Sequence, residues 1–281
     1  MIYISTGGFN KIQLSRILSL FNENSIRNLE LSGGLYTKNV YKILSKFKNL
    51  QFSLHNYFPV PIKSFVINLA SLDPKIAEMS MNQLKKSIYL SQKLKSKYYS
   101  IHAGFAFDPK VDELGKKIIY NKTYNRKKCF RLFLKRVNYL AKYAKKRGVK
   151  LLVENNVVTK KNLINKKNNP LLLCDPKEII FFFKNASDNV GLLLDLAHLK
   201  VSAKTLKFNL RGAHSKLSHL INGYHLSDNN GLKDTNDSFA KTSWFWKIIK
   251  KNLDYYSIEV YSKNFFLLKS LKNTLQKHII T

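Results

Sequence analysis

The sequence has few cysteines and no long apolar stretch. Cys129 and Cys174 are the only two cysteines in 281 residues. They are too few for a disulfide framework, and their spacing matches neither a zinc ribbon nor a redox motif, so we interpret both as structural. No segment approaches the roughly 20 consecutive apolar residues that span a bilayer, and the start, Met1 to Ser5, resembles a short strand and not a signal peptide. We therefore expect a cytoplasmic protein without a membrane span.

Acidic residues are also scarce. The chain has 17 Asp and Glu against 49 Lys and Arg, which gives a formal net charge of +32. A field of this sign attracts nucleic acid, anionic membranes and phosphorylated small molecules without selecting among them. Lys, Asn, Ile and Tyr are abundant together, a bias that base composition produces. The simplest interpretation of the lysines is therefore a set of solvated helix faces.

Eight short segments have the composition and the flanking turn signals of β-strands. Helical patterns separate them, and strands that alternate with helices pair in parallel. Eight such units favour closure into a (β/α)8 (TIM) barrel over an open sheet, and one barrel commonly has about 250 residues. The sequence therefore predicts an α/β fold with one TIM-barrel domain over residues 1–281. The predicted strands are Ile2–Ser5, Asn28–Leu31, Gln51–His55, Tyr98–His102, Lys150–Glu154, Val190–Asp195, Gly223–Leu226 and Tyr256–Val260.

Two of the intervening helices have clear end signals. Asp73 followed by Pro74 is typical of an N-cap with proline at the first helical position, and apolar residues then recur on one face until about Lys95. A second amphipathic pattern begins at Lys127, and Gly148 is placed to end it in the left-handed conformation. Both helices are expected to present their lysines and arginines to water.

Seven of the predicted strands have a residue that can bind a metal as their last or second-to-last residue. Reacting groups of TIM barrels lie at the carboxyl ends of the strands, and six of the 17 acids lie at or just beyond such ends. Like charges gathered at one rim repel in a low dielectric, and a divalent cation removes that cost. Mixed carboxylate and imidazole ligation suits Mn²⁺, Mg²⁺, Zn²⁺ or Co²⁺ without choosing among them. We therefore expect a divalent metal cofactor. The seven residues are Glu30, His55, His102, Glu154, Asp195, His225 and Glu259, and the two further acids are Asp228 and Asp234.

Six segments resemble the xylose-isomerase-like TIM-barrel superfamily, which includes sugar isomerases and epimerases as well as endonuclease IV (AP endonuclease family 2). The similarity runs in order from Glu30 to Glu259 and is specific as a set, although each motif alone is weak. It implies a TIM barrel independently of the periodicity. The segments are Ser53–His55, Phe65–Ser71, Ser100–Gly104, Leu152–Asn156, Leu194–His198 and Tyr224–Asp228.

The isomerase and epimerase members hold one metal on Glu, Asp, His and Glu from the last four strands, and these match Glu154, Asp195, His225 and Glu259. In those enzymes the metal chelates the carbonyl and the adjacent hydroxyl of the substrate and stabilises an enediolate, while two carboxylates move the proton. The resemblance assigns that catalytic role to Glu154 and Glu259. It also implies that His198 contacts a substrate oxygen.

The endonuclease IV members bind three zinc ions, and most of their ligand positions also have a match. His55 and His102 are candidates to contact substrate, or to hold a second ion beside Glu154, with Asp234 as a further candidate ligand. One position departs from the pattern, because Asn236 stands where that branch has histidine. An amide is a much poorer zinc ligand than an imidazole, so a third zinc would have only His198 and Asp234.

The leading hypothesis is therefore a metal-dependent isomerase or epimerase that acts on a small anionic sugar, such as a sugar phosphate. The alternative is an endonuclease IV-like zinc phosphodiesterase that acts on abasic-site DNA. Asn236 argues against that alternative, and so does the loop after His55, which is longer than in the endonuclease. Its Tyr57, Phe58 and Pro59 could cover a small-molecule pocket or pack on the barrel rim. A third class, with another reaction or with metabolite binding alone, has no direct support. The substrate, the metal and the oligomeric state stay open.

Overall fold

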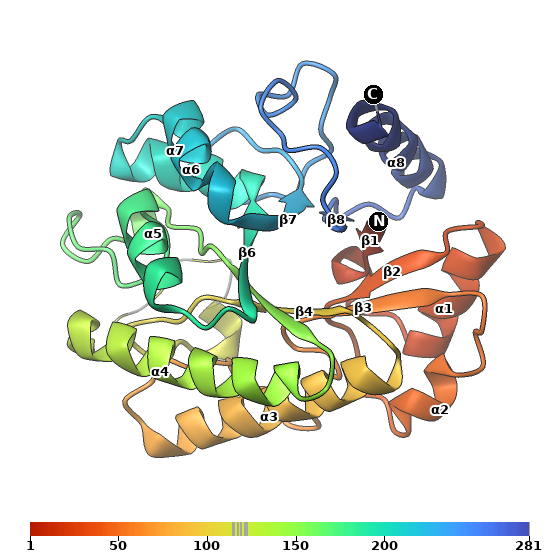
Figure 1. Ribbon diagram of the computed structural model, residues 1–281, viewed down its shortest axis with the longest axis horizontal. Coiled ribbons are helices and arrows are strands. Elements are labelled where there is room, and N and C mark those ends of the chain that lie inside the picture. Colours follow the sequence, from red (N-terminus) through yellow and green to blue (C-terminus); the bar gives the residue numbers. More distant parts are fainter. Residues whose placement is uncertain (114–115, 117, 119, 121–122, 281) are drawn as a thin grey trace.

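Eight short parallel strands close into a barrel in the computed structural model of the chain (Figure 1). The structure describes residues 1–113, 116, 118, 120 and 123–280. Each strand pairs with its neighbours in sequence, and β1 pairs with β8 to complete the ring. The predicted TIM barrel is confirmed. The strands are β1 (Ile2–Ser5), β2 (Asn28–Leu31), β3 (Gln51–His55), β4 (Tyr98–His102), β5 (Lys150–Glu154), β6 (Val190–Asp195), β7 (Ile221–Leu226) and β8 (Tyr255–Ile258).

The boundaries of β1 to β6 agree with the prediction, whereas β7 and β8 differ. β7 begins at Ile221, two residues before the predicted start, and β8 covers Tyr255–Ile258 instead of Tyr256–Val260. Glu259 therefore follows its strand, but its backbone N–H still donates to the carbonyl of Leu226 at 3.0 Å. The side chain of Glu259 thus leaves the barrel at the same rim as those of the other strand ends.

Helices surround the strands on the outside of the barrel (Figure 1). The two predicted helices are present: α3 begins at Pro74, with the Asp73 carboxylate accepting from the N–H groups of Lys75 and Ile76, and α4 begins one residue before Lys127. Gly148 adopts φ +67°, the left-handed conformation expected after α4. The helices of the described residues are α1 (Leu14–Glu23), α2 (Val40–Leu44), α3 (Pro74–Lys93), α4 (Arg126–Lys145), α5 (Pro176–Asn185), α6 (Leu196–Leu206), α7 (Leu210–Leu217) and α8 (Phe265–Ile280).

The connection between β7 and β8 departs from the expected alternation of strand and helix. Residues 227–254 are all described, and they form turns and bends without a helix. The first part of this segment, from Ser227 to Gly231, consists of serine, asparagine, aspartate and glycine, which favour turns. Buried Phe239 and Phe245 take the place of a helix, and Trp246 packs against both rings.

Inside the barrel, alternate residues of each strand point to the axis and form layers. Leu152 and Leu193 lie two residues before Glu154 and Asp195, so they share the inward face with them. These two leucines pack with Tyr3 and Tyr255 in one cluster. Gly223 makes room for Tyr255, since a Cβ atom at Gly223 would lie 2.9 Å from the tyrosine ring. An aromatic layer therefore lies directly beneath the polar strand ends.

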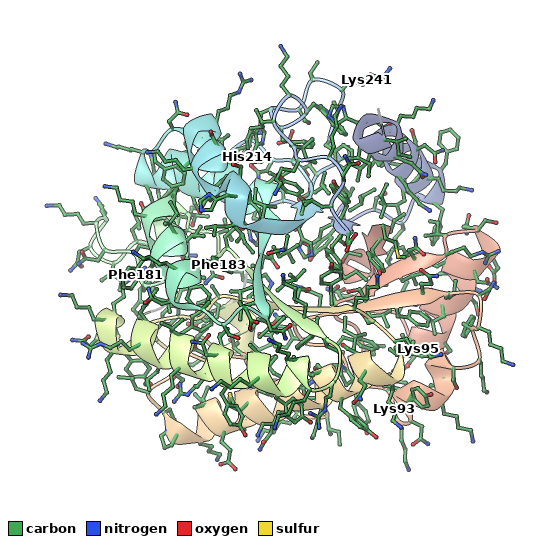
Figure 2. The ribbon with its side chains drawn as sticks, in the orientation of Figure 1. Lys93, Lys95, Phe181, Phe183, His214 and Lys241 are labelled. Atoms are coloured by element: carbon green, nitrogen blue, oxygen red, sulfur yellow. The ribbon has the colours of Figure 1, made fainter. Side chains whose placement is uncertain are left out.

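The cationic side chains lie on the outside of the molecule. Among the described residues, no Lys or Arg is buried, and the labelled Lys93, Lys95 and Lys241 lie at its periphery (Figure 2). This distribution agrees with lysines on solvated surfaces. None of the described helices is both long enough and apolar enough to cross a membrane.

Candidate metal centre

Four side chains from the last four strands converge at the carboxyl end of the barrel. Glu154 ends β5, Asp195 ends β6, His225 lies in β7 and Glu259 follows β8. One ligand atom from each lies within 4.8 Å of the others. Glu154, Asp195 and His225 are fully buried, and Glu259 is 6% exposed. The structure thus brings together the four residues that the sequence predicted as metal ligands.

The imidazole of His225 stands between carboxylates. Its Nδ1 lies 3.1 Å from Glu259 Oε2, 3.4 Å from Glu154 Oε1 and 3.9 Å from Asp195 Oδ2. Nδ1 has no hydrogen-bond partner among the described residues, and the same is true of both oxygens of Glu154 and of Asp195 Oδ2. Three carboxylates and one imidazole nitrogen therefore face a common centre without satisfying one another.

Burial and neighbouring charges shift the pKa values of Asp195 and Glu154 in opposite directions. Burial, supported by the charges of Glu154 and Asp234, raises the pKa of Asp195 to about 8, although His198 opposes the shift. For Glu154, burial alone would raise the pKa, but the imidazoles of His102 and His225 outweigh it and hold the pKa well below its usual range. In the described part of the chain, every ion pair of these two carboxylates is with a histidine, never with Lys or Arg.

These residues fit a divalent cation. Oxygen and imidazole nitrogen are suitable ligands for Mn²⁺, Mg²⁺, Zn²⁺ and Co²⁺. A bound cation would also satisfy the buried oxygens that lack partners, and it would offset both the burial and the carboxylate repulsion that raise the pKa of Asp195. The donor set alone does not choose among the metals.

A second group adjoins the first and consists of His55, His102 and Glu154. Nε2 of His55 lies 3.3 Å from Nε2 of His102 and 3.6 Å from Oε2 of Glu154. The expected third member, Asp234, does not belong to this group. It lies instead beside His198, with 3.1 Å between Asp234 Oδ2 and His198 Nε2. The reason is that Asp234 is carried by the helix-free β7–β8 connection, which passes α6 and not β3 or β4.

His198 is held by its neighbours in sequence and in space. Its backbone N–H donates to Asp195 Oδ1 at 2.6 Å, since Asp195 is also the N-cap of α6. Its Nδ1 lies 2.8 Å from the carbonyl of Asn155 and 3.3 Å from Glu154 Oε1. Both ring nitrogens are therefore engaged at the rim of the four-residue group. Asn236 is buried with φ +48°, and its carbonyl accepts from the N–H of Tyr261.

Two residues beyond the predicted set, Tyr261 and Asn155, contribute to the site, and the predicted candidate Glu30 has a role of its own. The hydroxyl of Tyr261 lies 3.4 Å from Glu259 Oε1. Its ring packs against Gly7, where a Cβ atom would lie 2.7 Å from the ring. Asn155 accepts from the N–H of Asp195 at 2.8 Å. Glu30 accepts from His225. Position at a strand end identified Glu30 as a candidate, but nothing in the sequence indicated its partner.

The loop after His55 packs on the barrel wall. Phe58 is 3% exposed, and the hydroxyl of Tyr57 accepts from the N–H of Ile67 at 3.2 Å. Farther along, Pro59 to Phe65 line an apolar groove of about 850 Å³ together with α2 and α3. None of the strand-end residues lines this groove, so it is separate from the four-residue group.

Fold and site together define a class of protein, namely a TIM barrel with a carboxylate and histidine cluster at the carboxyl ends of its strands. The sequence profile of the xylose isomerase-like TIM barrel matches residues 23–263, and the chain belongs to this family. Comparison with curated protein sequences gives no match.

Solved structures with the same fold include two from sugar epimerases. The chain is similar to a D-tagatose 3-epimerase-like protein, with 16% identity and a TM-score of 0.73 over 99% of this chain and 96% of that one. It is also similar to an L-ribulose 3-epimerase, with 15% identity and a TM-score of 0.69 over 99% and 94%. A family 2 AP endonuclease from Brucella melitensis has 13% identity and a TM-score of 0.64 over 97% and 98%. At these identities the likeness shows a shared fold.

Proposed function

We propose that the protein is a divalent-metal-dependent isomerase or epimerase that acts on a sugar or sugar derivative. The observation that carries this proposal is the buried group of Glu154, Asp195, His225 and Glu259, whose ligand atoms lie within 4.8 Å of one another. The similarity of fold to sugar 3-epimerases supports the substrate class. Glu154, Asp195, His225 and Glu259 would hold the metal. When bound, the ion supplies a Lewis acid that polarises the carbonyl oxygen and the neighbouring hydroxyl of the sugar.

The protein's own residues then move the proton. Glu154 and Glu259 come from different strands, so they can approach the reacting carbon from two sides, one removing a proton and the other returning one. The lowered pKa of Glu154 keeps this carboxylate ionised and able to accept. Tyr261 lies beside Glu259 and restricts its orientation. Burial of both carboxylates limits competition from water.

His102 and His198 are suited to binding the substrate. The side chain of His102 is 31% exposed, which makes it the most accessible histidine of the cluster. Partial burial of the ring, with a contribution from the neighbouring histidines, lowers the pKa of His102 to about 4, even though the charge of Glu154 opposes the shift. A neutral imidazole there can exchange hydrogen bonds with a sugar hydroxyl without adding charge. His198 would contact a second oxygen. His55 is buried, and its Nε2 lies 3.3 Å from Nε2 of His102.

Isotope exchange tests the proposed reaction. Purified protein with Mn²⁺ or Co²⁺ is incubated in D₂O with a panel of ketopentoses, ketohexoses and their phosphates, and the products are examined by NMR and mass spectrometry. We expect one deuterium on the carbon next to the carbonyl. A second experiment uses substrate that carries deuterium at this carbon. If the product formed in D₂O contains no solvent deuterium, and if the labelled substrate keeps its deuterium, then the proton does not pass through a carboxylate that exchanges with solvent.

An anionic substrate is supported by the net charge of +32, which raises the local concentration of anions. Comparison of each free sugar with its phosphate in the same panel tests this point. We expect the larger kcat/KM for the phosphate, with a difference that shrinks as salt is added.

A zinc phosphodiesterase acting on abasic-site DNA is the second candidate function. The observation that favours it is the adjoining group of His55, His102 and Glu154, which could hold a further ion, together with the pair of His198 and Asp234. Incubation of the zinc-loaded protein with an abasic-site duplex tests it. Cleavage accompanied by three tightly bound zinc ions would favour this function over the first.

A further inference from the structure

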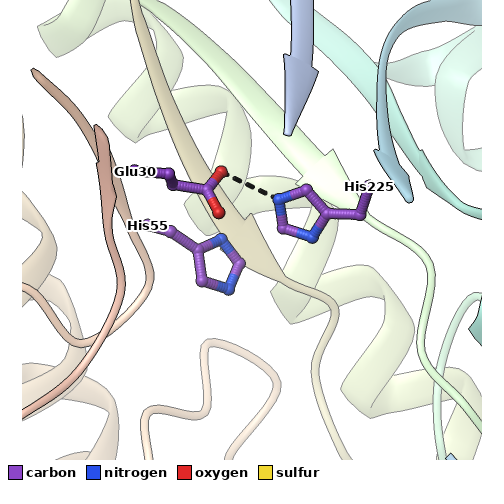
Figure 3. Close-up of side chains that lie close together, drawn as sticks. All are labelled: Glu30, His55 and His225. Atoms are coloured by element: carbon purple, nitrogen blue, oxygen red, sulfur yellow. Dashed lines mark hydrogen bonds and ion pairs between the residues drawn. The ribbon is translucent and has the colours of Figure 1, made fainter. Parts of the chain in front are cut away.

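Glu30 is a fully buried carboxylate at the end of β2 that the proposed chemistry does not use. Its Oε2 atom accepts a hydrogen bond from Nε2 of His225 at 2.8 Å (Figure 3). The same oxygen accepts from the hydroxyl of Tyr255. A buried carboxylate without partners would be costly, so these two donors stabilise Glu30 through Oε2, while Oε1 has no hydrogen-bond partner among the described residues.

The hydrogen bonds continue across the inside of the barrel. Ser53 Oγ donates to the hydroxyl of Tyr255 at 3.1 Å. The single proton of Tyr255 is then directed to Glu30, because its hydroxyl oxygen already accepts from Ser53. Gly223 leaves the space that the Tyr255 ring needs. Four strands, β2, β3, β7 and β8, thus cooperate to fix one carboxylate against one imidazole.

This arrangement makes the two nitrogens of His225 inequivalent. Nε2 donates to Glu30 and is therefore protonated. Nδ1 faces Glu259, Glu154 and Asp195 at 3.1, 3.4 and 3.9 Å. Only Nδ1 points to the centre that the carboxylates surround, and its lone pair is free when Nε2 carries the proton.

We propose that Glu30 is a positioning residue that holds His225 with Nε2 protonated, so that Nδ1 is the nitrogen offered to the metal. This role rests on the proposed function in one respect, the binding of a divalent ion by His225. A carboxylate that accepts from the far nitrogen of a metal-binding imidazole fixes the ring orientation and increases its basicity. In metal sites of this kind, loss of such a partner typically lowers the metal affinity by about 10- to 100-fold.

The alternative is an ion at Glu30 itself, since ligand atoms of Glu30, His55 and His225 also lie within 4.8 Å of one another. The hydrogen bonds argue against it. Nε2 of His225 already donates directly to Glu30, and Nδ1 of His55 lies 3.0 Å from Ser100 Oγ. Nε2 of His55 points to His102 and Glu154. Glu30 and His225 are therefore paired with each other and not arranged around an ion.

Two variants separate the hydrogen bond from the charge. Glu30→Gln keeps an oxygen that can accept from His225 but removes the charge, and Glu30→Ala removes both. Zn²⁺ affinity is measured by calorimetry, and ¹⁵N NMR of histidine-labelled, Zn²⁺-loaded protein identifies which nitrogen of His225 binds zinc. Tyr255→Phe is the matched control for the second donor, because it keeps Glu30 and the aromatic layer.

We expect zinc on Nδ1 and a proton on Nε2 in the unaltered protein. Affinity should fall about 10- to 100-fold in Glu30→Ala and less in Glu30→Gln and Tyr255→Phe. Should Glu30→Ala fail to fold, Glu30→Gln still tests the role through its affinity and its NMR spectrum. Zinc on Nε2, unchanged affinity in folded Glu30→Ala, or one bound ion fewer in Glu30→Gln would each overturn this role while leaving the proposed function standing. A protein that binds no divalent ion would overturn both.

Discussion

Histidines are the ion-pair partners of three buried strand-end carboxylates, Glu30, Glu154 and Asp195, among the described residues. The chain has 49 Lys and Arg, yet Glu30, Glu154 and Asp195 form their ion pairs with imidazoles in the part of the chain that the structure describes. A lysine or arginine is permanently charged and would compete with a cation, whereas an imidazole can lose its proton and become a ligand. The site therefore keeps its negative charge available.

Asp195→Asn tests the proposed metal ligands. Asparagine can replace aspartate as the N-cap of α6, so the fold should persist while one charged ligand is lost. We expect Mn²⁺ or Zn²⁺ affinity to fall by at least about 10-fold, with His225→Ala at least as severe. Calorimetry and metal analysis measure this. Asp175→Asn is the matched control, because Asp175 caps α5 in the same way outside the site. Equal metal binding by all three variants would refute the assignment.

Glu259→Gln tests proton transfer. The amide keeps the shape and one oxygen ligand but cannot act as a base, so turnover should fall by about 100-fold or more while the metal stays bound. Steady-state kinetics on the sugar that exchanges deuterium, with metal content measured on the same sample, check the prediction. Tyr261→Phe, which leaves the carboxylate in place, should have the smaller effect. Near-normal turnover in metal-loaded Glu259→Gln would rule out this role.

At the residue scale, sequence reasoning reached the individual ligands but not all of their partners. Each of the four residues of the main group ends or follows a strand that the sequence marks, and parallel strands bring such ends to one rim. The sequence left two placements open for Asp234, beside His55 and His102 or beside His198, because the path of a turn-rich segment is not encoded in a periodicity. The structure places Asp234 beside His198. The pairing of Glu30 with His225 spans 195 positions in sequence and depends on the register of distant strands.

At the scale of elements, the strands were predicted best where turn or helix signals mark both of their ends in the sequence. β1 to β6 are apolar runs bounded by turn or helix signals, and their ranges agree with the structure. The first two positions of β7 were missed because the pairing with β6 is irregular there: Ile221 pairs with Leu192, the polar Asn222 is passed over, and Gly223 pairs with Leu193. The missing helix between β7 and β8 could not be foreseen from the rule of alternation, which the first six strands follow.

His214 makes the junction of α7 with β7 sensitive to acid. Nε2 of His214 lies 2.9 Å from the hydroxyl of Tyr224, on which the ring is stacked. Burial, and to a lesser extent the charge of Lys250, lowers the pKa of His214 from 6.5 to about 4. The unfolded chain therefore binds this proton more tightly than the folded one. The stabilisation is complete above pH 6.5 and is lost as the pH falls from 6.5 towards 4.

We expect protonation of His214 to lower the free energy of unfolding by on the order of 2 to 3 kcal/mol as the pH falls from 6.5 to 4. Urea unfolding at a series of pH values, for the unaltered protein and for His214→Phe, isolates the contribution, since the other titrating groups are common to both. His219→Phe changes an exposed histidine nearby and serves as the control. Parallel pH profiles for the unaltered protein and His214→Phe would contradict the expectation.

At the scale of the whole molecule, the charge of +32 opposes compaction, because exposed cations repel one another. Added salt shortens the range of this repulsion to about 8 Å at physiological ionic strength. We expect the melting temperature to rise between about 10 and 300 mM KCl, as measured by calorimetry. Replacement of exposed lysines by glutamate, for example Lys93→Glu with Lys95→Glu, should reduce the rise. A melting temperature independent of salt would show that the charges are compensated in another way.

The segment from β7 to β8 carries both Asp234, which reaches His198, and Asn236, for which the resemblance to endonuclease IV led us to expect a histidine. Aromatic packing anchors it, not a repeating backbone ladder, so its length and its polar residues can change while β7, β8 and the layers beneath them are preserved. The side chains that face His198 from this connection can therefore differ without any change in the barrel that carries it.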